Sequence, residues 1–213
     1  MNIYILSDKK VAGAETLPVF DIHPIKQDID LSEYDALIFT SKNAVYSLDA
    51  MDQTWKEKPA YVIAPKTAKI VQALNGNLTF TGKAKHGNGF ASELCEMLQK
   101  QKVLYVRGRE VVSDLVNILK SHAIDCDELI IYETKCRTLG TEVKLPEHAT
   151  IIFTSPSTIK CFFKNITWQE SFKAVAIGHT TAKYFPSTIT PAIADTTSLE
   201  SCVQKAIEIN TIV

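Results

Sequence analysis

Two stretches of the chain repeat one another, DALIFTSKNAV at residues 35–45 and ATIIFTSPSTI at residues 149–159. They share four identities at an offset of 114 residues. At the same offset, AYVIAPKTAKI at residues 60–70 shares five identities with AVAIGHTTAKY at residues 174–184. Chance would supply roughly one identity in about 22 aligned positions, so the sequence indicates an internal duplication.

Around these repeats, short apolar runs alternate with stretches whose apolar residues recur every three or four positions. This alternation is typical of parallel sheets covered by helices on both faces. The predicted strands span residues 3–6, 19–23, 36–40, 61–64, 78–81, 103–107, 128–133, 150–154, 174–177 and 189–194. The predicted helices span residues 88–100, 110–121 and 197–208.

The order of the repeats predicts two domains, one of them built from both chain ends. A weaker match sets residues 2–11 over residues 102–112, with Tyr4 over Tyr105. The end of one unit therefore has its counterpart at the start of the chain. We predict an α/β fold of two flavodoxin-like or Rossmann-like parallel-sheet domains, with the second inserted in the first through a double connection and a cleft between them. The predicted limits are 1–22 plus 136–213 for domain 1 and 23–135 for domain 2.

The amino-acid composition excludes several classes of protein. The 213 residues are 46% hydrophobic and carry a net charge of −1, which excludes a disordered chain and gives no basic field for nucleic acid or anionic membranes. Apolar runs stay far below the roughly 20 residues of a membrane span. Without a signal-peptide pattern at the start, a cytoplasmic protein is predicted. The five cysteines include no CxxC pair and are predicted to be free thiols in a reducing cytoplasm.

Hydroxyl and amide side chains stand in both repeats where a strand ends and a helix begins. Such residues cap a helix by accepting hydrogen bonds from its free N–H groups, and capping alone would explain any one of them. The same helix starts also offer N–H donors and a positive dipole end to carboxylates or phosphates, outside the strand ends where α/β sheets bind ligands. The candidates are Thr40, Ser41, Asn43, Thr67, Thr154, Ser155, Ser157, Thr180 and Thr181.

Three further side chains are candidates. Arg107 and Arg109 flank a glycine after a strand and suit carboxylate recognition, although exposed charge at a helix start is an equal alternative. Tyr132 ends a predicted strand, and its protonated phenol can donate to a departing oxygen, with packing as the alternative. Scattered histidines predict no metal site, and the chain lacks GxGxxG, GxxxxGK[ST] and GxSxG patterns.

Taken in order, the repeated IFTS, VLYVRGRE, DELIIYET, IIFTSPSTIKCF and AVAIGHTTAKY resemble the uroporphyrinogen-III synthase family over nearly the whole chain. The resemblance implies two α/β domains joined by a two-stranded connection, and a monomeric, cofactor-free lyase of tetrapyrrole and heme biosynthesis. Members of this family act on hydroxymethylbilane: they expel its terminal hydroxyl, invert ring D through a spiro intermediate and close the macrocycle. The physical task is to hold a flexible polycarboxylate and prevent closure without inversion.

By this resemblance, Tyr132 in IYET matches a tyrosine that assists loss of the hydroxyl, and Thr180 and Thr181 in IGHTTA match a threonine turn that contacts substrate. The remaining matches are Thr40, Ser41 and Asn43 in FTSKNA, Ser155 and Ser157 in FTSPST and, more loosely, Thr67 in APKTA, where Ala64 replaces a glycine. Many members carry an arginine after the first strand, for which LSDKK offers Lys9 or Lys10. A bulky residue at position 181 is therefore expected to block the cleft.

Two other functions stay open on the sequence. One is a two-lobed protein that binds a small ligand without catalysis, which a duplicated α/β pair also suits. The other is a regulatory module whose cleft takes up a partner protein. The absent signal-peptide pattern disfavours an exported receptor, and no exposed aromatic stripe or charge block favours the regulatory module.

Overall fold

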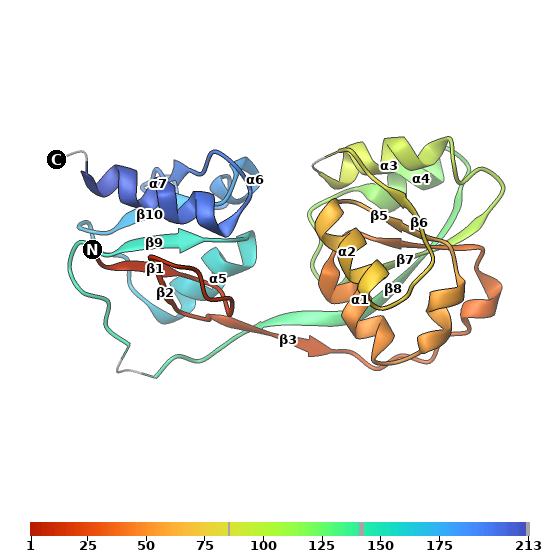
Figure 1. Cartoon of the computed structure of the whole chain (residues 1–213), viewed down its shortest axis with the longest axis horizontal. Helices are drawn as coiled ribbons and strands as arrows, with labels where there is room; N and C mark the ends of the chain where they lie inside the picture. Colours follow the sequence, from red (N-terminus) through yellow and green to blue (C-terminus); the bar gives the residue numbers. More distant parts are fainter. Residues whose placement is uncertain (85, 141–142, 212–213) are drawn as a thin grey trace. The chain divides into compact units, whose positions relative to one another are not determined.

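The computed structural model describes residues 1–84, 86–140 and 143–211 (Figure 1). The chain forms two compact units, Met1–Asp21 with Lys135–Val213 (unit 1) and Ile22–Thr134 (unit 2). Each unit holds one mostly parallel sheet, so the predicted α/β class with two parallel-sheet domains is confirmed. The domain limits predicted from the sequence lie one residue beyond these unit limits.

The sheet of unit 2 has the strand order β3-β8-β7-β4-β5-β6, and the strands from β8 to β6 run parallel. Its strands are β3 (Phe20–Pro24), β4 (Ala36–Phe39), β5 (Ala60–Val62), β6 (Leu78–Thr81), β7 (Lys102–Gly108) and β8 (Asp125–Cys136). Its helices are α1 (Lys42–Asp49), α2 (Pro65–Ala73), α3 (Gly87–Cys95) and α4 (Leu115–Ser121), with 3-10 turns at Leu31–Glu33 and Gln53–Glu57.

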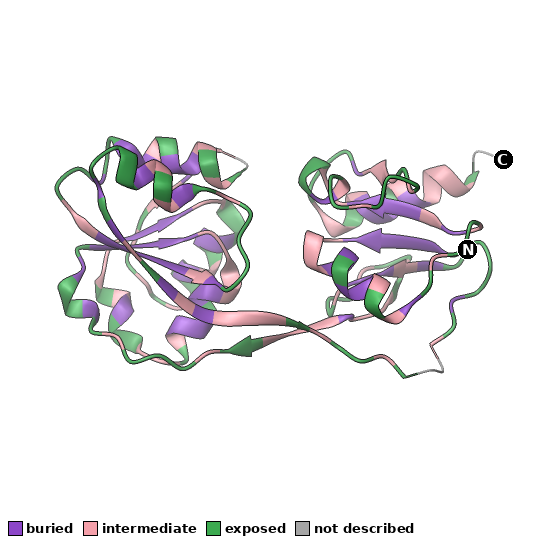
Figure 2. Ribbon diagram, turned by 180° about the vertical axis from the view of Figure 1, so that it is seen from behind, coloured by how far each residue is buried: buried purple, intermediate pink, exposed green. Residues whose placement is uncertain are grey.

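Successive residues of the central strands pack against opposite helix layers. Leu37 and Phe39 lie in an apolar core with residues of α1 and α2, whereas Ile38 and Tyr105 lie in a second core with residues of α3 and α4. Figure 2 shows these strands buried between the helices. Because successive side chains of a strand point to opposite faces, a sheet covered on both faces needs the continuous apolar runs seen in the sequence.

The sheet of unit 1 has the strand order β11-β10-β9-β1-β2, and all its strand pairs are parallel. Its strands are β1 (Ile3–Ile5), β2 (Glu15–Thr16), β9 (Thr150–Phe153), β10 (Lys173–Ala176) and β11 (Ala192–Ile193). Its helices are α5 (Pro156–Asn165), α6 (His179–Ala182) and α7 (Leu199–Thr211). The order β2-β1-β9-β10-β11 matches β8-β7-β4-β5-β6 of unit 2, which supports the duplication. Since β1 and β2 come first in the chain, the units are circular permutations of one another.

Strand register corrects one detail of the repeat alignment. Tyr105 pairs with Ile38, whose repeat counterpart is Ile152, and Ile152 pairs with Ile5. Tyr105 therefore corresponds to Ile5, and the alignment of Tyr4 over Tyr105 is wrong by one residue. A single shared tyrosine carries less information about register than the ladder of backbone hydrogen bonds.

The chain passes between the units through β3 and the end of β8, which confirms the predicted two-stranded connection. The N–H of Arg137 donates to the carbonyl of Val19 at 2.9 Å, and the N–H of Ile25 donates to the carbonyl of Ile131 at 2.8 Å. Val19 thus lies opposite Arg137, and Ile25 lies opposite Ile131. Since the chain rises in number along one segment while it falls along the other, β3 and the end of β8 run antiparallel. The Arg137 guanidinium also bonds both carboxylate oxygens of Asp21, at 2.9 and 3.0 Å from Nε.

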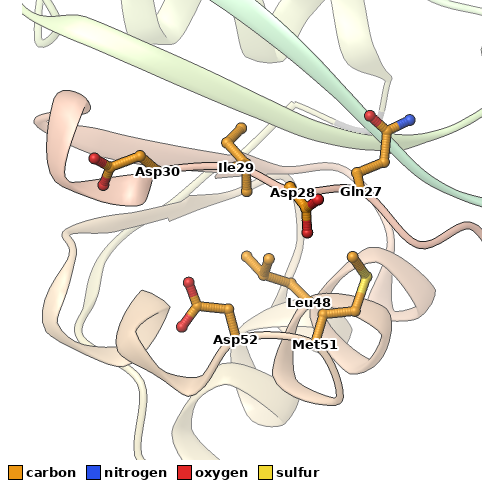
Figure 3. Close-up of a pocket in the computed structure, with 7 residues that line it drawn as sticks. All are labelled: Gln27, Asp28, Ile29, Asp30, Leu48, Met51 and Asp52. Atoms are coloured by element: carbon orange, nitrogen blue, oxygen red, sulfur yellow. The ribbon is translucent and has the colours of Figure 1, made fainter.

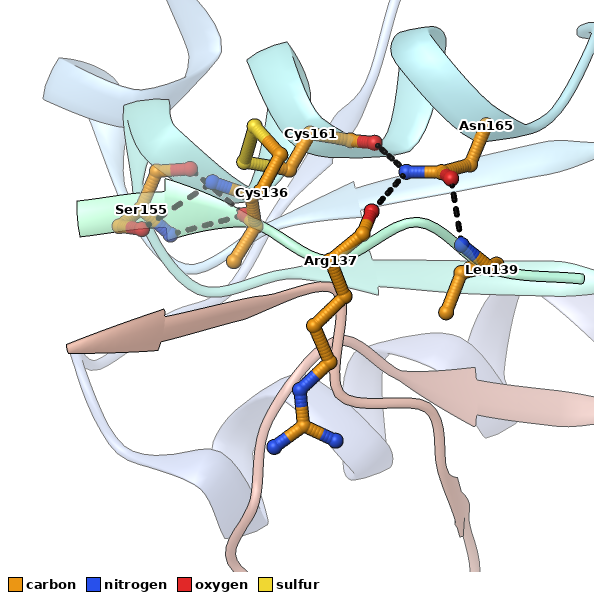
Figure 4. The surroundings of a disulfide bond; sticks show 7 residues. Cys136, Arg137, Leu139, Ser155, Cys161 and Asn165 are labelled. Atoms are coloured by element: carbon orange, nitrogen blue, oxygen red, sulfur yellow. Dashed lines mark hydrogen bonds between the residues drawn. A yellow bond between two sulfur atoms is a disulfide. The ribbon is translucent and has the colours of Figure 1, made fainter. Parts of the chain in front are cut away.

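Cys136 and Cys161 form a disulfide, so the prediction of five free thiols is wrong for these two residues. They lie 25 positions apart, yet the end of β8 and the buried face of α5 bring their Cα atoms to 5.0 Å. Asn165 of α5 holds the next turn beside them: its Nδ2 donates to the Arg137 carbonyl at 2.9 Å, and its Oδ1 accepts from the Leu139 N–H at 2.8 Å (Figure 4). The remaining cysteines, Cys95, Cys126 and Cys202, are buried.

All ten predicted strands are found, but β8 is longer than the predicted 128–133 and β11 is shorter than the predicted 189–194. Helices α1, α2, α5 and α6 lie outside the three helix ranges predicted from the sequence. Strand β2 was not predicted, because its two residues are too few to show an alternation of apolar and polar side chains. Helix α4 starts at Leu115 rather than residue 110, and α3 ends at Cys95 rather than residue 100. Within the described residues, none of the helices combines the length and the hydropathy that crossing a membrane requires.

Candidate functional site

In unit 2, two hydroxyl residues follow β4. Ser41 is the N-cap of α1, and its Oγ accepts a hydrogen bond from the Asn43 N–H at 3.1 Å. Thr40 shares a hydrogen bond of 2.7 Å with the phenol of Tyr105, a buried residue of the neighbouring strand β7. The first predicted row therefore caps a helix through Ser41 and binds the next strand through Thr40.

Tyr132 lies on β8 beside the end of β7, and β8 continues past it to Cys136, so the prediction that Tyr132 ends its strand is wrong. Its Cα partner is Gly108, the last residue of β7, and its ring packs against the apolar core that contains residues of α1 and α2. Burial raises the pKa of the Tyr132 phenol above its ordinary value of 10.0, and a hydrogen bond with Ser41 opposes part of this rise. The phenol is therefore protonated at neutral pH, and it can donate a proton at the turn that begins α1.

The two arginines differ in the burial of their side chains and in the number of hydrogen bonds they form within unit 2. The Arg107 side chain is 13% exposed, with Nε 2.5 Å from Glu128 Oε1 and Nη1 donating to the carbonyls of Gly108 at 2.8 Å and Arg109 at 3.1 Å. The Arg109 side chain is 58% exposed and bonds Glu133 at 3.2 Å. Exposed ion pairs contribute little, so the Arg109 guanidinium is held less tightly within unit 2 than that of Arg107. A carboxylate-binding role for either arginine stays a prediction.

In unit 1, the corresponding row follows β9. Thr154 donates to the carbonyl of Leu6 at 3.0 Å and so links β9 to β1. Ser155 is the N-cap of α5 and forms a capping box with Thr158. Ser157 is half-buried in the first turn of the helix. Ser155 thus fits the capping alternative, Thr154 links two strands, and a role of either toward a ligand stays a prediction.

The threonine turn begins at the N-cap Gly178 and continues into α6. Thr180 is exposed, whereas Thr181 is only 3% exposed. Its counterpart Thr67, at the same position of α2, is 5% exposed. Of these threonines, only Thr180 presents its side chain to solvent. Lys9 and Lys10 are exposed after β1, with the Lys9 N–H donating to Ser7 Oγ at 3.0 Å.

A pocket of about 510 Å³ lies in unit 2 away from these strand ends (Figure 3). Its lining includes Asp28, Asp30 and Asp52, of which Asp30 and Asp52 cap 3-10 turns. A hydrogen bond from Ser32 lowers the pKa of Asp30, so this carboxylate stays ionised and repels anionic ligands. The residues that the structure describes include no group of three or more His, Cys, Asp or Glu that could hold a metal ion.

A sequence model of the family described as uroporphyrinogen-III synthase HemD matches residues 8–204, nearly the whole chain. The chain belongs to the uroporphyrinogen-III synthase family. The resemblance in the sequence is thus confirmed. Among solved structures, the chain is similar to uroporphyrinogen-III synthetase from Helicobacter pylori 26695, with 32% identity and a TM-score of 0.85 over 98% of this chain and 99% of that chain.

Two other relatives of the uroporphyrinogen-III synthase family are more distant. The porphyrin biosynthesis protein HemD of Ruminiclostridium josui is 27% identical over 225 residues, which cover 92% of this chain but 44% of that protein. The chain therefore spans less than half the length of that curated relative. A mutant uroporphyrinogen III synthase from the bacterium Thermus thermophilus matches 92% of this chain and 90% of its own at 14% identity and a TM-score of 0.55, which shows the fold alone.

Sequence reasoning on this uroporphyrinogen-III synthase family member missed three residues near Tyr132. Tyr105 stands in an apolar strand run, so the sequence does not mark it as a site residue. In the structure, burial raises the pKa of its phenol, and hydrogen bonds with Thr40 and Ser113 partly oppose this rise. Ser113 lies in a segment predicted as helix. In the sequence, Gly108 stands between two arginines, and nothing there shows that it faces a tyrosine.

The burial of Thr181 changes the expected effect of a bulky residue. We expect Thr181→Leu to lower the free energy of unfolding by about 1–3 kcal/mol, because the side chain must enter a packed interior. Thr180→Leu should change stability by no more than about 0.5 kcal/mol and raise KM for the substrate, because it alters an exposed position of the turn. Urea unfolding and steady-state kinetics check both. Equal stability of the two variants would contradict the structural role of Thr181.

Proposed function

We propose that this chain is a uroporphyrinogen-III synthase, a lyase that converts hydroxymethylbilane to uroporphyrinogen III with loss of water and inversion of ring D. The observation that carries the proposal is the position of Tyr132, a half-buried phenol that lies beside Gly108 at the end of β7 in unit 2. Family membership and the similarity to the Helicobacter pylori enzyme support it.

In the proposed reaction, the Tyr132 O–H donates its proton to the terminal hydroxyl of the bilane, which departs as water. The pyrrole nitrogen supplies the electron pair that breaks the C–O bond. The substituted α-carbon of ring D bonds to the cationic methylene to give the spiro intermediate, and the bond from that carbon to the methylene of ring C then breaks. The ring C methylene bonds to the free α-carbon of ring D, which loses its proton to the phenolate, so the net change is the loss of one water. Catalysis consists mainly in positioning the flexible chain.

The substrate's carboxylates require donors rather than a strong basic field. We assign substrate contacts to the exposed Arg109 and Thr180 first, since their side chains reach solvent. The remaining predicted contacts, Thr40, Ser41, Asn43, Thr67, Arg107, Thr154, Ser155, Ser157 and Thr181, act mainly by holding the turns whose N–H groups face the ligand. The protein is proposed to work as a cytoplasmic monomer without a cofactor.

The test is a product-isomer assay. Hydroxymethylbilane generated by a deaminase is mixed with the protein, and the uroporphyrin isomers are separated after oxidation. Isomer III above the spontaneous background is expected. Isomer I alone, together with saturable binding of the bilane, would instead support the two-lobed binding protein. A chain inactivated by heat gives the background of spontaneous closure.

A further inference from the structure

Gly108 faces the ring of Tyr132 with no room between them. A Cβ built on Gly108 would lie 2.5 Å from Cζ, 2.7 Å from Cε2 and 2.9 Å from the hydroxyl oxygen of Tyr132. Gly108 is not among the residues with positive φ, so the backbone alone would accept alanine there. The glycine is therefore required for space rather than for backbone conformation.

The register of β7 and β8 produces this contact. Arg107 pairs with Ile130, but Gly108 pairs with Tyr132, so a bulge leaves Ile131 without a partner between them. Bulges change the direction of a side chain at the end of a strand. Here the bulge brings the phenol, rather than the apolar side chain of Ile131, over the glycine.

The surrounding hydrogen bonds hold the two residues in this arrangement. The Arg109 N–H donates to the Tyr132 carbonyl at 2.9 Å, and Arg107 Nη1 donates to the Gly108 carbonyl at 2.8 Å. At the other end of the side chain, interaction with Ser41 partly opposes the rise that burial causes in the pKa of the Tyr132 phenol. The ring of Tyr132 is thus limited on one side by Gly108, where no Cβ would fit.

We propose that Gly108 is a positioning residue for Tyr132: its missing side chain determines where the phenol lies. Carbon atoms in contact need about 3.5 Å, so alanine at position 108 must displace the ring by about 1 Å. A shift of this size in a reacting group lowers rates by about 100-fold. The effect on the rate rests on the proposed function, whereas the displacement of the ring does not.

The experiment compares Gly108→Ala with two matched glycine substitutions. Gly82→Ala also creates a close contact in unit 2, but with Phe90 at 2.6 Å, and Gly140→Ala meets nothing within 4 Å. The protein is labelled with tyrosine carrying 13C at Cζ, and the Tyr132 resonance is identified by its absence from Tyr132→Phe. We expect only Gly108→Ala to shift this resonance. An unshifted resonance would overturn the proposal.

Kinetics supply the second readout. Gly108→Ala should form isomer III about 100-fold more slowly, and Gly108→Ala/Tyr132→Phe should be no slower than Tyr132→Phe alone. Additive losses would overturn a role through Tyr132. If the wild-type protein forms no isomer III, the proposed function fails, and the resonance still decides the position of the ring. If Gly108→Ala does not fold, recovery of folding in Gly108→Ala/Tyr132→Ala supports the contact, and a failure to recover refutes it.

Discussion

Tyr132→Phe is expected to lower the rate of isomer III formation by about 100-fold or more, the contribution of a positioned proton donor. The phenol lies on β8 beside the end of β7, and its raised pKa keeps it protonated over the neutral range. Phenylalanine keeps the ring that packs against the core but removes the proton. The variant should therefore fold, with a stability within about 1.5 kcal/mol of wild type after loss of the polar hydroxyl.

The matched control is Tyr184→Phe, which removes the hydroxyl of a tyrosine that is 48% exposed in unit 1. It should retain the wild-type rate. Stopped-assay kinetics with isomer separation give both rates, and circular dichroism gives the unfolding curves. If Tyr132→Phe produced isomer III at the wild-type rate, Tyr132 would have no part in the chemistry, and the strand-packing alternative would hold.

Breaking the Cys136–Cys161 disulfide is expected to lower the free energy of unfolding by about 3 kcal/mol. The bond closes a loop between residues that are 25 positions apart, and a cross-link of that length restricts the unfolded chain. It also fastens the end of β8 to α5, beside the Asn165 bonds to Arg137 and Leu139. Urea unfolding with and without a thiol reductant measures the difference.

The control is the double variant Cys136→Ser/Cys161→Ser, whose stability should not respond to reductant. Thiol titration of the denatured wild-type protein without reductant should count three thiols, because two of the five cysteines are bonded. Five thiols would show that the bond does not form in the isolated protein. If three thiols were counted but the urea midpoint of unfolding were the same with and without reductant, the disulfide would not stabilise the protein.

The sequence predicted the strands well because each carries a continuous apolar run. Ala36–Phe39 and Thr150–Phe153 are buried at every position, as strands covered on both faces must be. The residues 110–114 were harder to predict: Val111 and Val112 fit an apolar helical pattern, yet they are exposed outside α4. Periodicity reports apolar spacing, and it cannot tell a buried face from an exposed loop.

The site was predicted only in part, for a similar reason. The sequence located Ser41, Ser155 and Thr181 at helix starts, where capping and ligand binding require the same residue types. Their hydrogen bonds and burial separate the two roles, and these depend on neighbours from other elements. The contact between Gly108 and Tyr132 depends on a bulge, which shifts strand pairing without any sequence signal of its own.

By itself, the sequence determined the α/β class, the duplication with its offset of 114 residues, and the family, because apolar runs and ordered motifs are local patterns. Only the tertiary structure decided that Cys136 meets Cys161, that Arg107 is largely buried in its ion pair while Arg109 is exposed, and that Gly108 lies against Tyr132. These pairings join residues on different elements, and their distances follow from how strands and helices pack.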